Sequence, residues 1–395
     1  MKRQTLYLLK TIAAIGTTTA ATVATVAAIR KRRATGPRRA TGDGRPDNDT
    51  PHDDSTEMLP LVDTAGNVVG QASRGHCHDG SGLLHPVVHL HVFDLDGKLY
   101  LQRRPMWKDI QPGKWDTAVG GHISMGETPH EALAREAAEE LGLTDFRFRH
   151  LDTYVHESAV ERELVHVYRC TYAGCPHPTA ELDGGRFMSA SQIRRAADAH
   201  SLTPNFASEH DRLFPLDIRR ATEADIPTLR RLAEATFVPT YRPILTPEQL
   251  DYMMEWMYSA GSLHQQMASG HAFYLAEDED GPCGYVSIEQ QGENLFHLQK
   301  LYVHPSRQKR GYGQRLFMQA ADYATALTDG PCRIELNVNR DNPALHFYEH
   351  MGMRCDRSLD TPIGNGYYMN DYIMALDLAD GSLPESHPLR YDSIR

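Results

Sequence analysis

The 395-residue sequence lacks the features that mark several classes of protein. Its six cysteines include no CxxC pair, so neither a structural zinc site nor a disulfide framework is indicated. A net charge of −11 leaves no basic excess for binding nucleic acid, and no internal repeat is present. We therefore expect a protein of a reducing compartment that has no nucleic-acid partner.

Long hydrophobic runs are also scarce, and the one candidate is weak. Residues 11–29 hold no charge over 19 positions, near the ~20 residues of a membrane span, but Ala and Thr dominate and Leu is absent. The basic RKRR at 30–33 would leave the following domains on the cytoplasmic side of a membrane. A targeting peptide and a leader without function remain open. We expect a cytoplasmic protein whose only membrane contact, if it has one, is through residues 11–29.

Composition shifts divide the chain into four segments. Residues 1–57 are a hydrophobic and basic leader with a polar linker rich in Gly, Pro and Asp, and residues 380–395 are a loose tail. Between them lie a first domain at 58–217, whose residues 201–217 cross to the second, and a second domain at 218–379. Both mix helical and strand patterns, so the predicted fold class is α/β, or more broadly α+β.

The first domain holds a helix with clear ends. Thr128 is placed to cap the helix, Pro129 fits its first position, and Glu131 completes a capping box. Gly142 stands where a helix usually ends. The sequence therefore predicts a helix between Thr128 and Gly142.

Three glutamates near the end of this helix work against its stability. Glu136, Glu139 and Glu140 fall at i, i+3 and i+4, where each like-charged pair costs about 0.2–0.5 kcal/mol. Acidic side chains in the last turn also oppose the helix dipole. A hard divalent cation would remove the conflict, because it takes carboxylate oxygens as ligands. We therefore predict a catalytic Mg²⁺ or Mn²⁺ site at these three carboxylates.

The residues around this helix resemble the Nudix box. Gly121 is followed by Glu127, then by Arg135-Glu136 and Glu139-Glu140, at the spacing of that motif. The resemblance implies a Nudix α/β/α sandwich that hydrolyses a nucleoside diphosphate, or another diphosphate, linked to a further group. It also implies that the Gly121 carbonyl joins the glutamates at the metal and that Glu127 pairs with Arg135. The metal would neutralise the diphosphate and position a water.

Residues outside the box resemble the Nudix branch that contains type 1 isopentenyl-diphosphate isomerase. His78 and His85 match its two early metal histidines, His122 matches the third, and Glu161 and Glu163 match its acidic ligands. The resemblance implies a second metal site, for Mn, Zn or Mg. Histidines that are only surface or core residues are the plainer interpretation.

One departure separates the chain from that branch. Gly120 stands where the isomerase has its catalytic cysteine, whereas the Nudix box is complete here. Diphosphate hydrolysis is therefore favoured over isomerisation, which remains the alternative. Arg103, Arg104 and Lys108 are candidates for binding the diphosphate.

In the second domain a glycine-rich turn separates a strand from a helix. Gln308, Arg310, Gly311 and Gly313 form the pattern Q-x-R-G-x-G, and a long helix is predicted to follow. Glycines let backbone N–H groups approach a pyrophosphate at the start of a helix, and no acid occupies its first turn. Strands are predicted at 272–277, 283–303, 333–338 and 367–377.

The turn and its surroundings resemble the GNAT acetyltransferases. That family's pattern implies a mixed-sheet domain and acetyl-CoA contacts at Leu301, Tyr302, Val303, Gln308, Lys309, Arg310, Gly311, Tyr312, Gly313 and Asn342. Tyr348 corresponds to the general acid near the departing coenzyme thiolate. Residues 236–259 are either the acceptor pocket or a core helix, and Glu289 and His297 are candidates for the base.

The sequence thus predicts a bifunctional enzyme. Its first activity is Nudix diphosphate hydrolysis with Mg²⁺ or Mn²⁺, and its second is N-acetylation with acetyl-CoA as co-substrate. The expected partners are a small-molecule diphosphate and an amine. A domain that senses a ligand without turnover is the remaining alternative.

Overall fold

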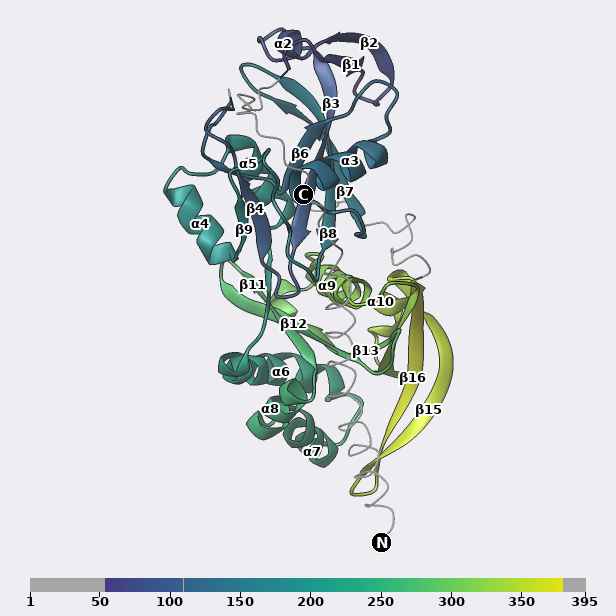
Figure 1. The fold of residues 1–395 in the computed structure, drawn as a ribbon. Helices are drawn as coiled ribbons and strands as arrows, with labels where there is room; N and C mark the ends of the chain where they lie inside the picture. Colours follow the sequence, from purple (N-terminus) through teal and green to yellow (C-terminus); the bar gives the residue numbers. More distant parts are fainter. Residues whose placement is uncertain (1–53, 109, 379–395) are drawn as a thin grey trace, which may run out of the picture.

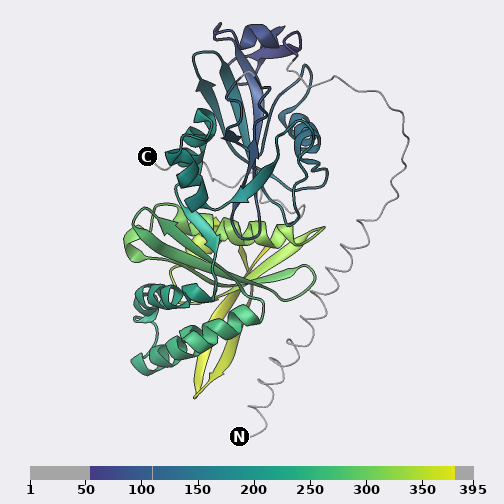
Figure 2. The same ribbon diagram turned by 60° about the vertical axis from the view of Figure 1, so that its left-hand side comes forward.

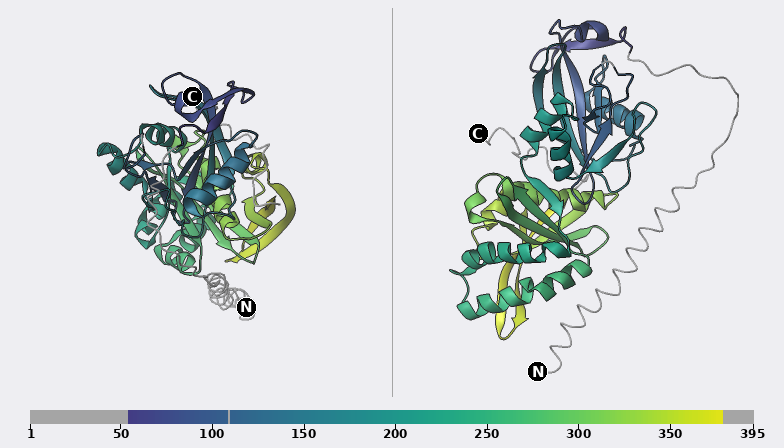
Figure 3. Two further views of the ribbon diagram at one scale, coloured as in Figure 1. Left: turned by 45° about the horizontal axis from the view of Figure 1, so that its top comes forward. Right: turned by 90° about the vertical axis from the view of Figure 1, so that its left-hand side faces the viewer.

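The computed structural model describes residues 54–108 and 110–378, which form two sheet-centred bodies (Figure 1). Figures 2 and 3 show the same two bodies stacked end to end from other sides. Residues 1–53 of the predicted leader and linker, which include the uncharged run, and the predicted tail lie outside the described residues. None of the helices in the described ranges combines the length and the hydrophobicity that a membrane-spanning helix requires.

The first body is built on a seven-stranded mixed sheet. Its strands run in the order β5-β4-β3-β8-β7, with β6 paired to β3 and β9 paired to β4. Only the β3–β8 pair is parallel among the pairs of this sheet that the structure describes. The elements are β1 (Met58–Val62), β2 (Val68–Ser73), α2 (Arg74–Cys77), β3 (Leu84–Phe93), β4 (Leu99–Arg103), β5 (Trp115–Asp116), β6 (Val119–His122), α3 (Pro129–Leu141), β7 (Arg149–Glu157), β8 (Arg162–Thr171), β9 (Gly185–Met188), α4 (Ala190–Asp198) and α5 (Pro204–Leu213).

Alternation along β3 gives this sheet two differently covered faces. Val88 and Leu90 pack with Leu133 of α3 on one face. Val87 belongs to a cluster with Leu213 of α5 on the other face. Because neighbouring side chains of a strand point to opposite sides, the helices α3 and α5 sandwich the sheet (Figure 1). This placement decides which polar side chains of β3 face which helix.

The predicted helix is confirmed together with its caps. Thr128 accepts a hydrogen bond from the Glu131 N–H, and the Glu131 side chain accepts one from the Thr128 N–H. Gly142 ends the helix with a φ of 64°. Only glycine adopts this left-handed conformation without strain, which explains the residue type at this position.

The second body is built on a seven-stranded sheet in the order β10-β11-β12-β13-β14-β16-β15. The helices α6, α7 and α8 cover one face, and α9 and α10 cover the other (Figure 1). The elements are β10 (Asp217–Arg220), α6 (Ile226–Tyr241), α7 (Pro247–Tyr258), α8 (Ala260–Ala268), β11 (Ala272–Asp278), β12 (Gly281–Gln290), β13 (Leu295–Val303), α9 (Tyr312–Ala326), β14 (Cys332–Asn339), α10 (Leu345–His350), β15 (Arg354–Gly364) and β16 (Tyr367–Leu378).

Three features of the chain depart from the sequence-based description. The predicted strand 283–303 is two antiparallel strands, β12 and β13. The strand β15 was not predicted, because nearly all of its residues are exposed and carry no apolar alternation. Residues 201–217, expected only to cross between the domains, contain the helix α5, which begins with Thr203 as its cap and Pro204 at its first position.

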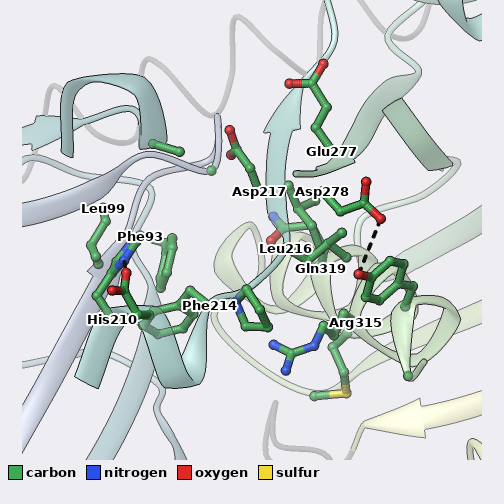
Figure 4. Close-up of a pocket in the computed structure, with 18 of the residues that line it drawn as sticks. Phe93, Leu99, His210, Phe214, Leu216, Asp217, Glu277, Asp278, Arg315 and Gln319 are labelled. Atoms are coloured by element: carbon green, nitrogen blue, oxygen red, sulfur yellow. Dashed lines mark hydrogen bonds and ion pairs between the residues drawn. The ribbon is translucent and has the colours of Figure 1, made fainter. Parts of the chain in front are cut away.

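The two bodies meet where the helix α9 lies against β7 and β8. Arg169 forms an ion pair with Asp322 at 3.1 Å and donates to Gln319 at 3.0 Å. Beside this contact lies a cavity of about 1290 Å³ that both bodies line. Figure 4 shows Phe93 and Phe214 on one of its sides and Arg315 on another.

Candidate active sites

The end of α3 is organised by one arginine. Arg135 donates through Nη1 to Glu136 Oε1 at 2.7 Å and to Glu139 Oε2 at 3.1 Å. Its Nε donates to Glu127 Oε1 at 2.9 Å, so the predicted pairing of Glu127 with Arg135 is present. Two of the three box carboxylates are therefore neutralised by a neighbouring side chain. A cation at Glu136 and Glu139 has to compete with Arg135.

The third box carboxylate faces the backbone of β6. Glu140 Oε2 accepts from the Gly120 N–H at 3.3 Å, and burial raises the pKa of Glu140 well above its usual range. Burial also raises the pKa of Glu136, although Arg135 opposes the change. A Cβ atom at Gly121 would lie 2.0 Å from Glu136 Cδ, so Glu136 fills the space that a larger residue would need.

The three predicted histidine ligands come together on the other face of the sheet. His78 Nε2 and His122 Nε2 are 3.0 Å apart, and the ring centroids of His78 and His85 are 5.1 Å apart. His85 is fully buried, and its Nε2 has no hydrogen-bond partner among the described residues. Burial lowers the pKa of His85 and of His122, which favours the neutral imidazole that binds metals.

The two predicted carboxylates lie beside these histidines. His78 Nδ1 is 3.1 Å from Glu161 Oε2, and His85 Nε2 is 4.0 Å from Glu163 Oε1. Burial raises the pKa of Glu163 to about 7. Two sets of three ligand atoms within 4.8 Å of one another occur in the described residues, and the box glutamates do not form such a set. They are His78, His85 and His122, and His156, Glu161 and Glu163.

These donors fit a divalent ion. Imidazole nitrogens and carboxylate oxygens suit Mn, Zn or Mg, and the partnerless His85 Nε2 is a buried acceptor that an ion would satisfy. If His78 donates through Nδ1 to Glu161, its Nε2 lone pair faces His122. A shared cation would relieve the close approach of two unprotonated nitrogens.

The box glutamates and the histidines approach β6 from opposite sides. Gly121 pairs with Val88 of β3, and its Cβ position faces Glu136. Gly120 pairs with His89, and its Cβ position faces the His89 ring at 3.6 Å. The strand β6 therefore separates two groups of metal-capable side chains with only its backbone between them.

The predicted diphosphate-binding cations lie near β5. Arg104 Nη1 donates to Asp116 Oδ2 at 2.9 Å, and Arg104 Nε donates to the Ile110 carbonyl at 3.0 Å. Arg103 is 3.8 Å from Asp183, and Lys108 lies over the Trp107 ring. Arg104 thus shapes its own loop as well as supplying charge.

In the second body the strands β13 and β14 separate along their length. They form a parallel pair only where Leu295–His297 of β13 lies beside Arg333–Glu335 of β14. Beyond this point a cavity of about 1100 Å³ opens between them. The backbone of residues 298–303 therefore faces a space in which a ligand can take the place of the neighbouring strand.

This cavity gathers nearly all of the residues predicted to contact the coenzyme. Arg310 alone among them lies elsewhere, on the cavity between the two bodies. Gly311 has a φ of 77° and caps α9, whose first turn contains no acid. Asn342 Oδ1 accepts from the Ala344 N–H at 2.9 Å, so it caps the turn before α10, which begins at Leu345.

Tyr348 lines the same cavity and is 8% exposed. Burial raises the pKa of Tyr348, which keeps its hydroxyl protonated at neutral pH. The base candidates are less well placed, because His297 Nε2 bonds to Asn337 Oδ1 at 2.9 Å and Glu289 lies 3.6 Å from His271. Neither Glu289 nor His297 lines the cavity between β13 and β14.

Two residues at these sites, Lys300 and Glu209, were not predicted from the sequence. Lys300 lines the cavity, is 7% exposed, and donates to Gln266 Oε1 at 2.6 Å; burial lowers its pKa to about 8. Glu209 of α5 is 1% exposed beneath the histidine face of the first body. The Thr203-Pro204 start signal was available for α5, but no local pattern reveals which of its residues meets the sheet.

Comparison with known proteins covers both bodies. The family described as NUDIX domain matches residues 83–209, and the family described as Acetyltransferase (GNAT) domain matches residues 269–354. The chain is 34% identical over 156 residues to the isopentenyl-diphosphate Delta-isomerase of Streptomyces griseus, covering 37% of this chain and 77% of that protein. It is 31% identical over 182 residues to the enzyme of the same name from Brevibacterium linens, covering 43% of this chain and 98% of that protein.

Solved structures that resemble the chain cover about two fifths of it. A Deinococcus radiodurans protein is 26% identical and covers 40% of this chain and 99% of its own, with a TM-score of 0.37. The PaiA N-acetyltransferase of Thermoplasma acidophilum, solved in complex with coenzyme A, is 22% identical and covers 41% and 99%, with a TM-score of 0.35. By its sequence relatives and both domain matches, the chain belongs to the Nudix family, within the branch of the isopentenyl-diphosphate isomerases, and carries a GNAT acetyltransferase domain after the Nudix domain.

Proposed function

We propose that the first domain hydrolyses a small diphosphate ester with the help of a divalent metal. The observation that carries this proposal is the convergence of His78, His85, His122 and two glutamates beside a position, Gly120, that has no side chain. A metal there would polarise the diphosphate, and hydrolysis requires no thiol in addition. The proposed ligands are His78, His85, His122, Glu161 and Glu163.

The box residues have a supporting part in this proposal. Glu140 faces the β6 backbone from the α3 side, and the box carboxylates Glu136 and Glu139 with the Gly121 carbonyl are the proposed holders of a Mg²⁺ or Mn²⁺ that accompanies the diphosphate. Arg103 and Lys108 would add positive charge near the same substrate group. Arg135 would act as the counterion of the box when that ion is absent.

The second candidate is isomerisation of isopentenyl diphosphate. It is favoured by the names of the relatives. The histidine and glutamate pattern that the sequence resemblance implies also favours it. Incubation of the purified protein with isopentenyl diphosphate and Mg²⁺ or Mn²⁺ separates the two reactions. Phosphate release without dimethylallyl diphosphate supports hydrolysis, whereas dimethylallyl diphosphate without phosphate release overturns it. A screen of further diphosphates for phosphate release would then identify the substrate.

We propose that the second domain transfers an acetyl group from acetyl-CoA to a small-molecule amine. The support is the separation of β13 from β14 over a cavity that ends at a glycine turn and the start of α9. The N–H groups of this turn would hold the pyrophosphate, and the unpaired edge of β13 would bind the amide groups of the pantetheine arm. Tyr348 would protonate the departing thiolate.

A free-thiol assay with acetyl-CoA and a set of amines tests this second activity. Thiol release that depends on an added amine supports N-acetylation. Binding of acetyl-CoA without turnover for any amine would point to a ligand sensor instead. The amine would enter at the part of the predicted acceptor region that lines the cavity, which comprises Thr236, Pro239, Thr240, Tyr241, Pro243 and Ile244.

A further inference from the structure

A buried cluster of charged and polar side chains adjoins the first site on the α5 side of the sheet. The carboxylate of Glu209 in α5 is hydrogen-bonded to two histidines. Its Oε2 lies 3.0 Å from His89 Nδ1, and its Oε1 lies 2.6 Å from His91 Nε2. Tyr154 of β7 donates its hydroxyl hydrogen to Glu209 Oε2 at 2.7 Å. The Glu209 side chain is fully buried, so a single carboxylate is surrounded by three potential donors.

The charge of this carboxylate requires a positive partner. A buried carboxylate without a cation is strongly unfavourable, so one of the two histidines is expected to be protonated. His91 Nδ1 is buried without a hydrogen-bond partner among the described residues, and a proton there would be unsatisfied. His89 has no such difficulty, because its side chain is 12% exposed. The geometry therefore assigns the positive charge to His89.

The electrostatic surroundings of His89 agree with this assignment. Burial alone would lower the pKa of His89, but Glu209 outweighs it and raises the pKa to about 9. The other charged groups that face it are Glu163 of β8 and Asp116 of β5, and both act in the same direction. His156 of β7 also lies within electrostatic range.

The free end of the His89 ring faces the backbone of Gly120 in β6. With Nδ1 bound to Glu209, the other nitrogen is available, and a Cβ atom at Gly120 would lie 3.8 Å from His89 Nε2. Gly120 is exposed, and the His89 side chain beside it is partly exposed, so this edge of the cluster is in contact with solvent. His89 and the metal-site His85 are four residues apart on the same face of β3, about 13 Å along the strand.

We propose that His89, held by Glu209, binds the diphosphate end of the substrate and donates its Nε2 proton to the leaving oxygen. This role rests on the hydrolysis proposed above. Water adds to phosphorus, and the bond between phosphorus and the leaving oxygen breaks with its electron pair on that oxygen. The oxygen takes the Nε2 proton, the water loses a proton to solvent, and His89 is reprotonated from solvent. Glu209 is a positioning residue, because it touches His89 and not the substrate.

The test uses the full chain and a diphosphate that cannot be hydrolysed, methylenediphosphonate with Mg²⁺. The variant His89→Asn keeps a donor near the Nδ1 position and removes Nε2, whereas Glu209→Gln keeps the shape and removes the charge. His166→Asn, on the opposite face of the same sheet, is the matched control. Calorimetry at pH 7 should show about tenfold weaker binding for His89→Asn and an unchanged constant for the control.

Two further readouts separate a direct role from a structural one. Nitrogen-15 spectra of histidine-labelled wild-type protein should show a cationic His89 at pH 7. In Glu209→Gln the same ring should be neutral at about this pH. Binding to the wild type should weaken as the pH rises through about 9, and this dependence should be missing in His89→Asn. Equal binding by wild type and His89→Asn, or a neutral His89 at pH 7, overturns the proposal.

The outcome is separable from that of the proposed hydrolysis. If no diphosphate is hydrolysed but His89→Asn still weakens diphosphonate binding, the binding role of His89 stands and the proton transfer falls with the hydrolysis. If a diphosphate is hydrolysed and His89→Asn changes neither binding nor the alkaline limb of the kcat profile, the role of His89 falls alone.

Discussion

Replacement of Gly121 by alanine tests the arrangement of the box glutamates. The new Cβ atom would lie 2.0 Å from Glu136 Cδ, whereas ordinary contact begins at 3.4 Å, so the carboxylate has to move away. This movement strains the 2.7 Å hydrogen bond from Arg135 to Glu136. A charge-assisted hydrogen bond contributes about 1.5–3 kcal/mol, and the flexible side chain can recover part of it. We expect a loss of about 1.5 kcal/mol, or about 3–6 °C in Tm.

The effect on activity should be larger than the effect on stability. Misplacement of a catalytic group by about 1 Å can reduce a rate about 100-fold, so Gly121→Ala should lose about that factor in phosphate release. The measurements are calorimetry and the phosphate-release assay with Mg²⁺. Gly120→Ala is the matched control for stability, because its Cβ meets His89 only at 3.6 Å, and its Tm should stay within about 1 °C of the wild type. Unchanged rate and Tm for Gly121→Ala would refute the placement of Glu136 against β6.

The remaining predictions concern both domains. Tyr348→Phe should lower kcat for acetyl transfer at least tenfold with little change in KM for acetyl-CoA, and an unaltered kcat would contradict its role as the acid. Lys300→Met should raise the free energy of unfolding by about 1–2 kcal/mol at pH 7. Because the pKa of Lys300 is lowered to about 8, the wild type gains stability as the pH rises from 8 to 10. The advantage of the variant should therefore shrink over this range in pH-dependent calorimetry. Mn²⁺ at 100 times its dissociation constant should stabilise the first domain by about 2.7 kcal/mol, and His122→Ala should abolish the shift in Tm; a shift that survives would place the metal elsewhere.

Local signals were sufficient for the elements that position both sites. The start of α3 follows from Thr128, Pro129 and Glu131, because capping depends on residues within one turn of each other. The turn before α9 follows from its glycines for the same reason. The strand β15 left no such signal, because its exposed residues pair with β16 through backbone hydrogen bonds that any residue type can make.

The box shows how far a motif can be carried without tertiary structure. The resemblance to the Nudix box implies correctly that Glu127 pairs with Arg135. It does not reveal that the same guanidinium also takes Glu136 and Glu139, because an arginine side chain reaches several neighbours and its choice depends on their burial. The resemblance supplied the residues of this site, and the packing of α3 against β6 decided their partners.

The sequence by itself determined where the helix α3 begins and ends, the position of the glycine turn before α9, and the family of each domain. The tertiary structure alone decided which distant side chains meet: His78 with His122, 44 positions apart, and His89 with Glu209, 120 positions apart. The physical reason is that caps and turns are fixed by neighbours in the chain. A cluster on a sheet depends on strand register and on the helix that covers the face, and neither has a period that can be read along the sequence.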